Sequence, residues 1–142
     1  MMRTIFLFVL LFVAAFSSGA CRKKGVSPVS PVGSAASVDK ARKFTGEDMR
    51  AAILRACMDK GWSPAEPTPG LIEASLEVRG KHAVVVDIPY TNQQYQIKYK
   101  RSVNMKEHEL ESDGSVLIHP NYNKWVGALD KAVKANIART RS

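Results

Sequence analysis

Apolar residues recur at helical spacing in two stretches of the chain. The first predicts a helix over residues 46–60, with Thr45 as its N-cap and Gly61 as its stop. The second predicts a helix over residues 122–139, with Asn121 as its N-cap. The apolar faces consist of Met49, Ala52, Ile53, Ala56 and Cys57 in the first helix and of Tyr122, Trp125, Val126, Leu129, Val133 and Ile137 in the second. Because each helix has one apolar face, both are expected to cover a common core.

Between these helices, apolar and polar residues alternate in three stretches, which is the pattern of half-buried strands. The stretches are residues 72–79, 83–90 and 95–100. Since the connections between them are short, we expect an antiparallel meander. The predicted fold class is therefore α+β, a three-stranded antiparallel meander sheet covered on one face by two helices in the order α-β-β-β-α.

The alternation also predicts how the strands pair. A three-residue loop at residues 80–82 aligns Val78 with Val84, whereas a two-residue turn would put Asp87 on the buried side. We therefore expect the three-residue loop, with Asp87 on the outer face. The other expected pairs are Leu76 with Val86, Ala74 with Ile88, Tyr90 with Tyr95, Ile88 with Ile97, Val86 with Tyr99 and Asp87 with Lys98, and Glu77 is expected near Lys100.

The remaining segments between the helices are predicted to be irregular. Residues 62–70 contain three prolines, which exclude a helix and a central strand, so we expect a loop packed by Trp62. Residues 101–115 are acidic and aperiodic, and we expect a second loop. Its Glu107-His108-Glu109 run is interpreted as solvated charge, because adjacent residues do not share a face. The short apolar run at residues 116–118 is expected to extend the sheet or fill the core.

The N-terminal pattern predicts export. Arg3 precedes a twelve-residue apolar run, Ile5–Phe16, and small residues lead to Cys21, which is typical of a signal peptide over residues 1–20. Twelve residues would cover only ~18 Å of a hydrocarbon core of ~30 Å, so a membrane span is not expected. The sequence Ser18-Gly19-Ala20-Cys21 resembles the lipobox of bacterial lipoproteins. The resemblance implies lipidation of Cys21 and anchoring in a lipid bilayer.

Two details of this segment bear on its processing and destination. Ser18 stands where the lipobox has a branched aliphatic residue, and Ser18 and Ala20 also satisfy the small-x-small rule of ordinary signal peptidase. A soluble secreted protein is therefore the alternative. Arg22 follows Cys21 in place of the aspartate that retains enteric lipoproteins in the inner membrane. The resemblance thus implies the outer membrane, facing the periplasm.

Composition and charge divide the chain. Residues 22–43 are rich in Ser, Pro, Gly and Ala and predict a flexible tether. The predicted organisation is a signal peptide at 1–20, a lipidated cysteine and tether at 21–43, and one globular domain at 44–142. The formal charge of the chain is +8, but residues 44–142 hold 14 basic and 12 acidic residues. Most of the excess positive charge thus lies in the tether, where it meets phospholipid headgroups or is solvated, and no nucleic-acid partner is expected.

Cysteine usage is sparse. Beyond Cys21 there is only Cys57, so the chain can form no disulfide within the domain and has no Cys-x-x-Cys metal motif. Cys57 lies one turn after Ile53 on the apolar helix face, which predicts a small buried hydrophobe, and the alternative is a reactive or intermolecular thiol. We expect neither a metal nor a cofactor.

The densest polar cluster lies where the last loop meets the last helix. It comprises His119, Asn121, Tyr122, Asn123 and Trp125, with Ser102 and Asn104 at the far end of the loop. The functional interpretation is a corner that binds a small polar group or a peptide, helped by the helix N-terminus. The alternative is a structural corner. No nucleophile is paired with a base in a supporting motif, so enzyme activity is not expected.

The segments YQIKYKRSVNM and IHPNYNKWVGALDKAV are similar to those of small, uncharacterised proteobacterial lipoproteins. This resemblance implies export and lipidation and brings no known activity. We expect a membrane-anchored envelope lipoprotein that acts as a non-enzymatic interaction or assembly-accessory module with an envelope protein as partner. The alternative is a periplasmic protein that binds a small ligand or peptide at the His119–Trp125 corner.

Overall fold

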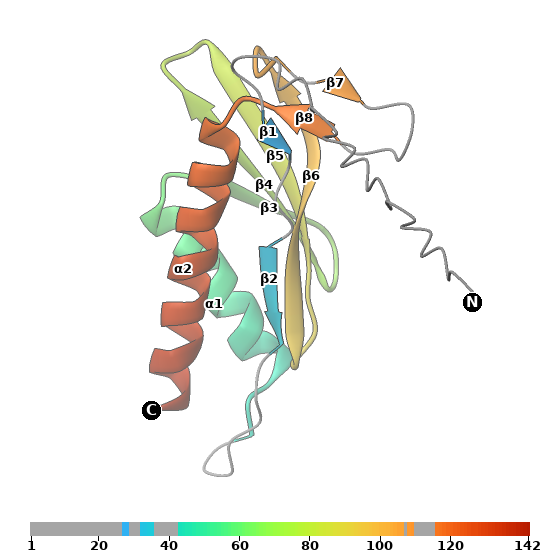
Figure 1. Cartoon of the computed structure of the whole chain (residues 1–142). Helices are drawn as coiled ribbons and strands as arrows, with labels where there is room; N and C mark the ends of the chain where they lie inside the picture. The colour runs from blue at the N-terminus through green and yellow to red at the C-terminus, as the bar shows by residue number, and fades with distance from the viewer. Residues whose placement is uncertain (1–26, 29–31, 36–42, 107, 110–115) are drawn as a thin grey trace, which may run out of the picture.

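The computed structural model describes residues 27–28, 32–35, 43–106, 108–109 and 116–142. Helices α1 (Gly46–Asp59) and α2 (Asn121–Arg141) lie side by side on one face of a five-stranded antiparallel sheet (Figure 1). The sheet has the order β2-β6-β5-β4-β3 and consists of β2 (Val32–Ala35), β3 (Ser63–Thr68), β4 (Leu71–Val78), β5 (His82–Pro89) and β6 (Gln94–Val103). The α+β class is confirmed, but the predicted three-stranded sheet is wrong.

The two additional strands lie at the edges of the sheet. β3 comes from the proline-rich segment predicted to be a loop, and it pairs with β4. Pro64 and Pro67 are compatible with an edge strand, where one side of the backbone needs no sheet partner. Trp62, just before β3, is buried as predicted. Neither edge strand shows the apolar alternation that predicted the three central strands. Both are paired through their backbones with a neighbouring strand, and this pairing does not require alternating apolar side chains.

Strand β2 comes from the segment predicted to be a tether. It pairs with β6 from Val32 opposite Ile97 to Ala35 opposite Gln94. The two backbones are close, since a Cβ atom added at Gly33 would lie 2.6 Å from the carbonyl oxygen of Tyr95. Glycine is therefore required at this position of the strand.

A second, small sheet lies at the end of the molecule where α2 begins (Figure 1). It has the order β1-β8-β7 and consists of β1 (Ser27–Pro28), β7 (His108–Glu109) and β8 (Val116–Ile118). The apolar run at residues 116–118 thus forms a strand of this small sheet, and Ile118 is fully buried. Two segments of the predicted tether, residues 27–28 and 32–35, are therefore paired with strands of the domain.

Helix α1 follows its sequence pattern closely. Thr45 is the N-cap and forms a capping box with Asp48, while Gly61, with a φ angle of 75°, follows the last turn. The buried residues are those of the predicted apolar face: Met49, Ala52, Ile53, Ala56 and Cys57. Local spacing and capping were sufficient to define this helix.

Helix α2 has the predicted apolar stripe but a different start. Tyr122, Val126, Leu129, Val133 and Ile137 are buried, and Trp125 is partly buried against the core. The N-cap position is Pro120, which has no side-chain capping bond, and the helix begins at Asn121. The prediction of Asn121 as the N-cap is therefore wrong.

The predicted register between β4 and β5 is off by two residues. Val78 lies opposite His82, and Leu76 lies opposite Val84. The loop begins one residue earlier than predicted, because Arg79 and Gly80 both adopt positive φ angles, 56° and 62°. An even shift keeps each side chain on its own face, so Asp87 still lies away from the core.

The register between β5 and β6 is confirmed at three pairs: Tyr90 with Tyr95, Asp87 with Lys98 and Val86 with Tyr99. Beyond Tyr99 the register shifts, and Arg101 pairs with Val85, so Lys100 is the additional residue of a β-bulge. On the outer face, Lys100 Nζ forms ion pairs with Glu73 and, at 3.1 Å, with Asp87. The expected proximity of Glu77 to Lys100 is thus replaced by a contact with Glu73.

Candidate functional site

A backbone hydrogen bond brings the two halves of the predicted corner together. The N–H of His119 donates to the carbonyl oxygen of Met105 at 2.9 Å. Met105 is fully buried in the core, so this bond fixes the segment after β6 against the start of α2.

The imidazole of His119 takes part in the start of α2. Its Nδ1 atom accepts a hydrogen bond from the N–H of Asn121 at 3.2 Å, and its carbonyl oxygen accepts one from the N–H of Tyr122 at 3.0 Å. The first N–H groups of a helix have no partner within the helix. His119 therefore supplies the acceptor that the sequence prediction had assigned to Asn121.

The side chains of Ser102 and Asn104 contact the sheet. Asn104 Nδ2 donates to the carbonyl oxygen of Lys81 at 2.7 Å, and the carbonyl oxygen of Asn104 lies 2.9 Å from His82 Nδ1. These bonds hold the end of β6 against the turn between β4 and β5. Ser102 Oγ lies 3.0 Å from Tyr99 Oη.

The remaining members of the corner are partly or fully buried. Tyr122 is fully buried, and its ring meets Tyr99 edge to face with 5.6 Å between the ring centroids. Trp125 packs against the core, and Asn121 and Asn123 are half-buried in the first turn of α2. The geometry favours the structural interpretation of the corner, and ligand binding there stays a prediction.

Sequence reasoning missed a buried carboxylate on α2. Asp130 is 6% exposed; its Oδ1 accepts a hydrogen bond from Tyr95 Oη at 2.6 Å, and its Oδ2 lies 2.7 Å from Lys134 Nζ. Burial, together with the bond to Asp130, raises the pKa of Tyr95. The signal was present in the sequence, because Asp130 lies four residues after Val126 and three before Val133, on the apolar stripe.

A second buried polar residue joins the two helices. Asn136 is 1% exposed, and its Nδ2 donates to the carbonyl oxygen of Ala52 in α1 at 3.2 Å. Its Oδ1 accepts a hydrogen bond from Arg139 at 3.2 Å. The amide nitrogen and the amide oxygen are therefore both satisfied, and the bond to Ala52 fixes how α2 sits on α1.

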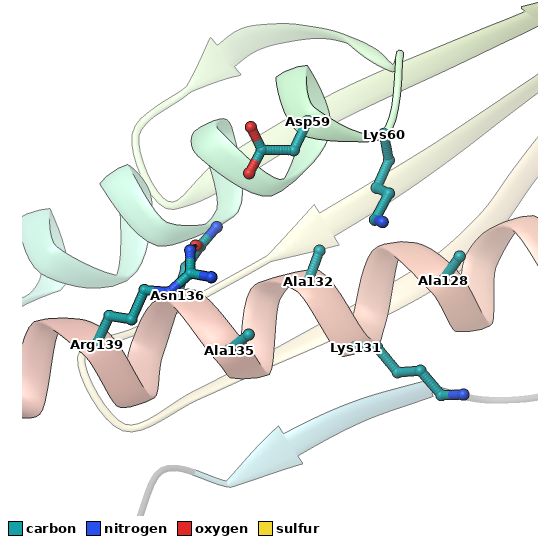
Figure 2. Close-up of a pocket in the computed structure, with 8 residues that line it drawn as sticks. All are labelled: Asp59, Lys60, Ala128, Lys131, Ala132, Ala135, Asn136 and Arg139. Carbon is teal, nitrogen blue, oxygen red and sulfur yellow. Dashed lines mark hydrogen bonds between the residues drawn. The ribbon is translucent and has the colours of Figure 1, made fainter.

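A groove with a volume of about 310 Å³ opens beside Asn136, between the C-terminal end of α1 and the middle of α2 (Figure 2). Lys60 and Arg139 give it two positive charges and Asp59 gives it one negative charge, while Lys131 lines the groove with its side chain directed away from α1 (Figure 2). The complete lining is Asp59, Lys60, Ala128, Lys131, Ala132, Ala135, Asn136 and Arg139. The groove therefore combines short apolar side chains with an excess of positive charge.

The charge of α2 extends beyond the groove. The helix has five basic residues and one acidic residue, and that acidic residue is the buried Asp130. The basic residues are Lys124, Lys131, Lys134, Arg139 and Arg141. The near balance of charge over residues 44–142 had concealed this concentration on one helix.

Cys57 is buried in α1, as predicted, and burial raises its pKa to about 12. The thiolate, and not the neutral thiol, is the nucleophile that attacks iodoacetamide and displaces iodide. We expect alkylation of Cys57 by iodoacetamide at pH 8 to be at least about 100-fold slower in the folded protein than in 8 M urea. Mass spectrometry of the peptide that contains Cys57 measures this ratio. Similar rates in the two conditions would contradict the burial of this thiol.

Several predicted features lie outside the described residues. Cys21, the predicted lipidation site, and Glu107 are among them, and only the backbone of residues 108–109 is described. Within the described part of the chain, no group of three His, Cys, Asp or Glu side chains could hold a metal ion. None of the helices that the structure describes is long and apolar enough to cross a membrane.

The fold and the groove define an α+β domain with two helices on one face of a five-stranded antiparallel sheet and a basic groove between those helices. Comparison with protein-family models, curated proteins and solved structures finds no match for the chain. Inferences about its function therefore rest on its own residues.

Proposed function

We propose that the chain is a lipid-anchored envelope protein whose domain binds another protein. The observation that carries the proposal is the apolar run Ile5–Phe16 followed by Ser18-Gly19-Ala20-Cys21, which combines an export signal with a lipidation sequence. More than one acyl chain is needed for stable anchoring, and a triacylated cysteine meets this requirement. The outer membrane, on its periplasmic side, is the proposed location.

The polar residues of the domain support a binding role over a catalytic one. His119, Asn104, Asp130 and Asn136 all make hydrogen bonds that join elements of the fold. The charged side chains of α2 are mostly exposed, and charge at a surface contributes to partner selection and to the rate of association. The proposed role is therefore that of a non-enzymatic interaction module.

Metabolic labelling with a fatty acid tests the anchor. We expect labelled protein in the membrane fraction for the wild type and for Cys57→Ala, and neither label nor membrane association for Cys21→Ser. Cys57→Ala is a matched control because Cys57 is the other cysteine of the chain. Unlabelled wild-type protein would disprove lipidation. Affinity purification from solubilised membranes then tests the module, with a stoichiometric protein partner as the expected result and an isolated protein as the contrary one.

A further inference from the structure

We infer that the groove between α1 and α2 binds an acidic segment of a partner polypeptide. The inference rests on the proposed function, because it assigns the contact surface of the interaction module. It follows from the charge of the groove, the hydrogen-bonding capacity of its cations and its shape.

The cations of the groove come from both helices. Lys60 lies at the C-terminal end of α1, and Arg139 lies on α2 (Figure 2). These two cations outnumber the single carboxylate, Asp59, by two to one, and Lys131 also lines the groove although its side chain is directed away from α1 (Figure 2). A segment that carries Asp or Glu side chains would therefore be attracted to the groove, while a basic segment would be repelled.

These cations retain hydrogen-bonding capacity for a ligand. Arg139 donates through one nitrogen to Asn136, and a guanidinium group has five N–H donors in total. The backbone N–H of Lys60 donates to carbonyl oxygens of the last turn of α1, while its ammonium group makes no hydrogen bond or ion pair with the residues that the structure describes. Arginine–carboxylate pairs are charge-assisted and often bidentate, so Arg139 is suited to hold an incoming carboxylate.

The shape of the groove favours a polypeptide segment over a membrane surface. Ala128, Ala132 and Ala135 contribute only methyl groups, which leaves space beside the backbone of α2. A volume of about 310 Å³ is at the lower end for ligand pockets, and it accommodates a few side chains. A flat bilayer would meet the protruding parts of the helices, whereas a segment of chain can enter the hollow between them.

Binding of a fluorescent ten-residue polyglutamate peptide to the full chain in neutral detergent tests this inference. We expect saturable binding, no binding of polyglutamine of equal length, and at least a tenfold loss of affinity in Lys60→Glu/Arg139→Glu. The matched control is Lys98→Glu/Arg101→Glu, which changes the net charge equally on the exposed outer face of β6. We expect less than a twofold loss in that control.

A second variant separates loss of charge from loss of structure, because Arg139 also bonds to Asn136. Lys60→Gln alone removes no side-chain hydrogen bond or ion pair among the described residues and places no carboxylate at the C-terminal end of α1, so we expect at least a threefold loss with an unchanged melting temperature. Equal losses in the groove and control variants would overturn the inference in favour of general charge attraction. Binding of inorganic phosphate or anionic phosphatidylglycerol vesicles, with the same dependence on Lys60 and Arg139 but without polyglutamate binding, would overturn it in favour of a phosphate group.

The outcome is distinguishable from a failure of the proposed function. If the groove variant still purifies with the stoichiometric partner of the wild type, the interaction module stands and the groove is not its contact surface. If the wild type has no partner, the proposed function fails regardless of peptide binding.

Discussion

Replacement of Tyr122 by alanine is expected to lower the free energy of unfolding by about 3–5 kcal/mol. Tyr122 is a large, fully buried side chain, so its truncation leaves a cavity at the start of α2. The edge-to-face contact with Tyr99, with centroids 5.6 Å apart, is also lost. Such a pair contributes about 0.5–1.5 kcal/mol beyond its buried area. Urea unfolding followed by tryptophan fluorescence measures the change.

The matched control is Tyr122→Phe, which retains the ring. The hydroxyl oxygen of Tyr122 is buried, and it has no hydrogen-bond partner among the described residues. Removal of this hydroxyl group removes the cost of burying an unpaired polar group. We therefore expect the free energy of unfolding to be unchanged or raised by up to about 1 kcal/mol. A loss of more than about 1 kcal/mol in this variant would show that the hydroxyl group has a stabilising partner.

Replacement of Asp130 by alanine is expected to lower the free energy of unfolding by about 2–3 kcal/mol, because the hydroxyl of Tyr95 then lacks its acceptor. Tyr95 is 3% exposed, and its 2.6 Å bond to Asp130 connects β6 to α2. Lys134 has a half-exposed side chain and can be hydrated again after the change. The same unfolding measurement applies, and Lys134→Ala is the control, with an expected loss below about 1 kcal/mol.

A double-mutant cycle isolates the bond itself. In Tyr95→Phe/Asp130→Ala both partners are absent, so the combined loss should be smaller than the sum of the two single losses by about 1–2 kcal/mol. Additive losses would mean that the hydroxyl and the carboxylate do not interact in solution.

The helices could be predicted from the sequence because their determinants are local. The capping box of Thr45 and the spacing of Met49, Ile53 and Cys57 define α1 within a few residues. In the three central strands, alternation correctly predicted which face each side chain occupies, because successive residues of a strand point to opposite faces whatever the register. The pairing of β4 with β5 depended instead on the backbone of Arg79, whose positive φ angle no residue type signals.

The missing strands and the missed site residues have different causes. β2 and β3 are held by backbone hydrogen bonds to β6 and β4, and their sequences, VGSA and SPAEPT, show no apolar alternation. The residues of the predicted corner were identified as a cluster, but the direction of the Asn104 and His119 hydrogen bonds depends on the tertiary fold. The position of Asp130 on the apolar stripe could be read from the sequence, but its partner Tyr95 and the groove depend on how α2 packs against the sheet and against α1.

The pairing of β1 with β8 has a consequence for how the domain would stand on a membrane. Ser27 is paired with Ile118, so a lipid on Cys21 would be separated from this fixed point by at most about 20 Å of extended chain. The small sheet and the start of α2 lie at the same end of the molecule, and the C-terminus lies at the other (Figure 1). A helix of 21 residues is about 30 Å long. If Cys21 carries the proposed lipid, this short segment between Cys21 and Ser27 would keep the small sheet near the lipid headgroups. It would thereby restrict the orientations that the domain can adopt relative to the membrane.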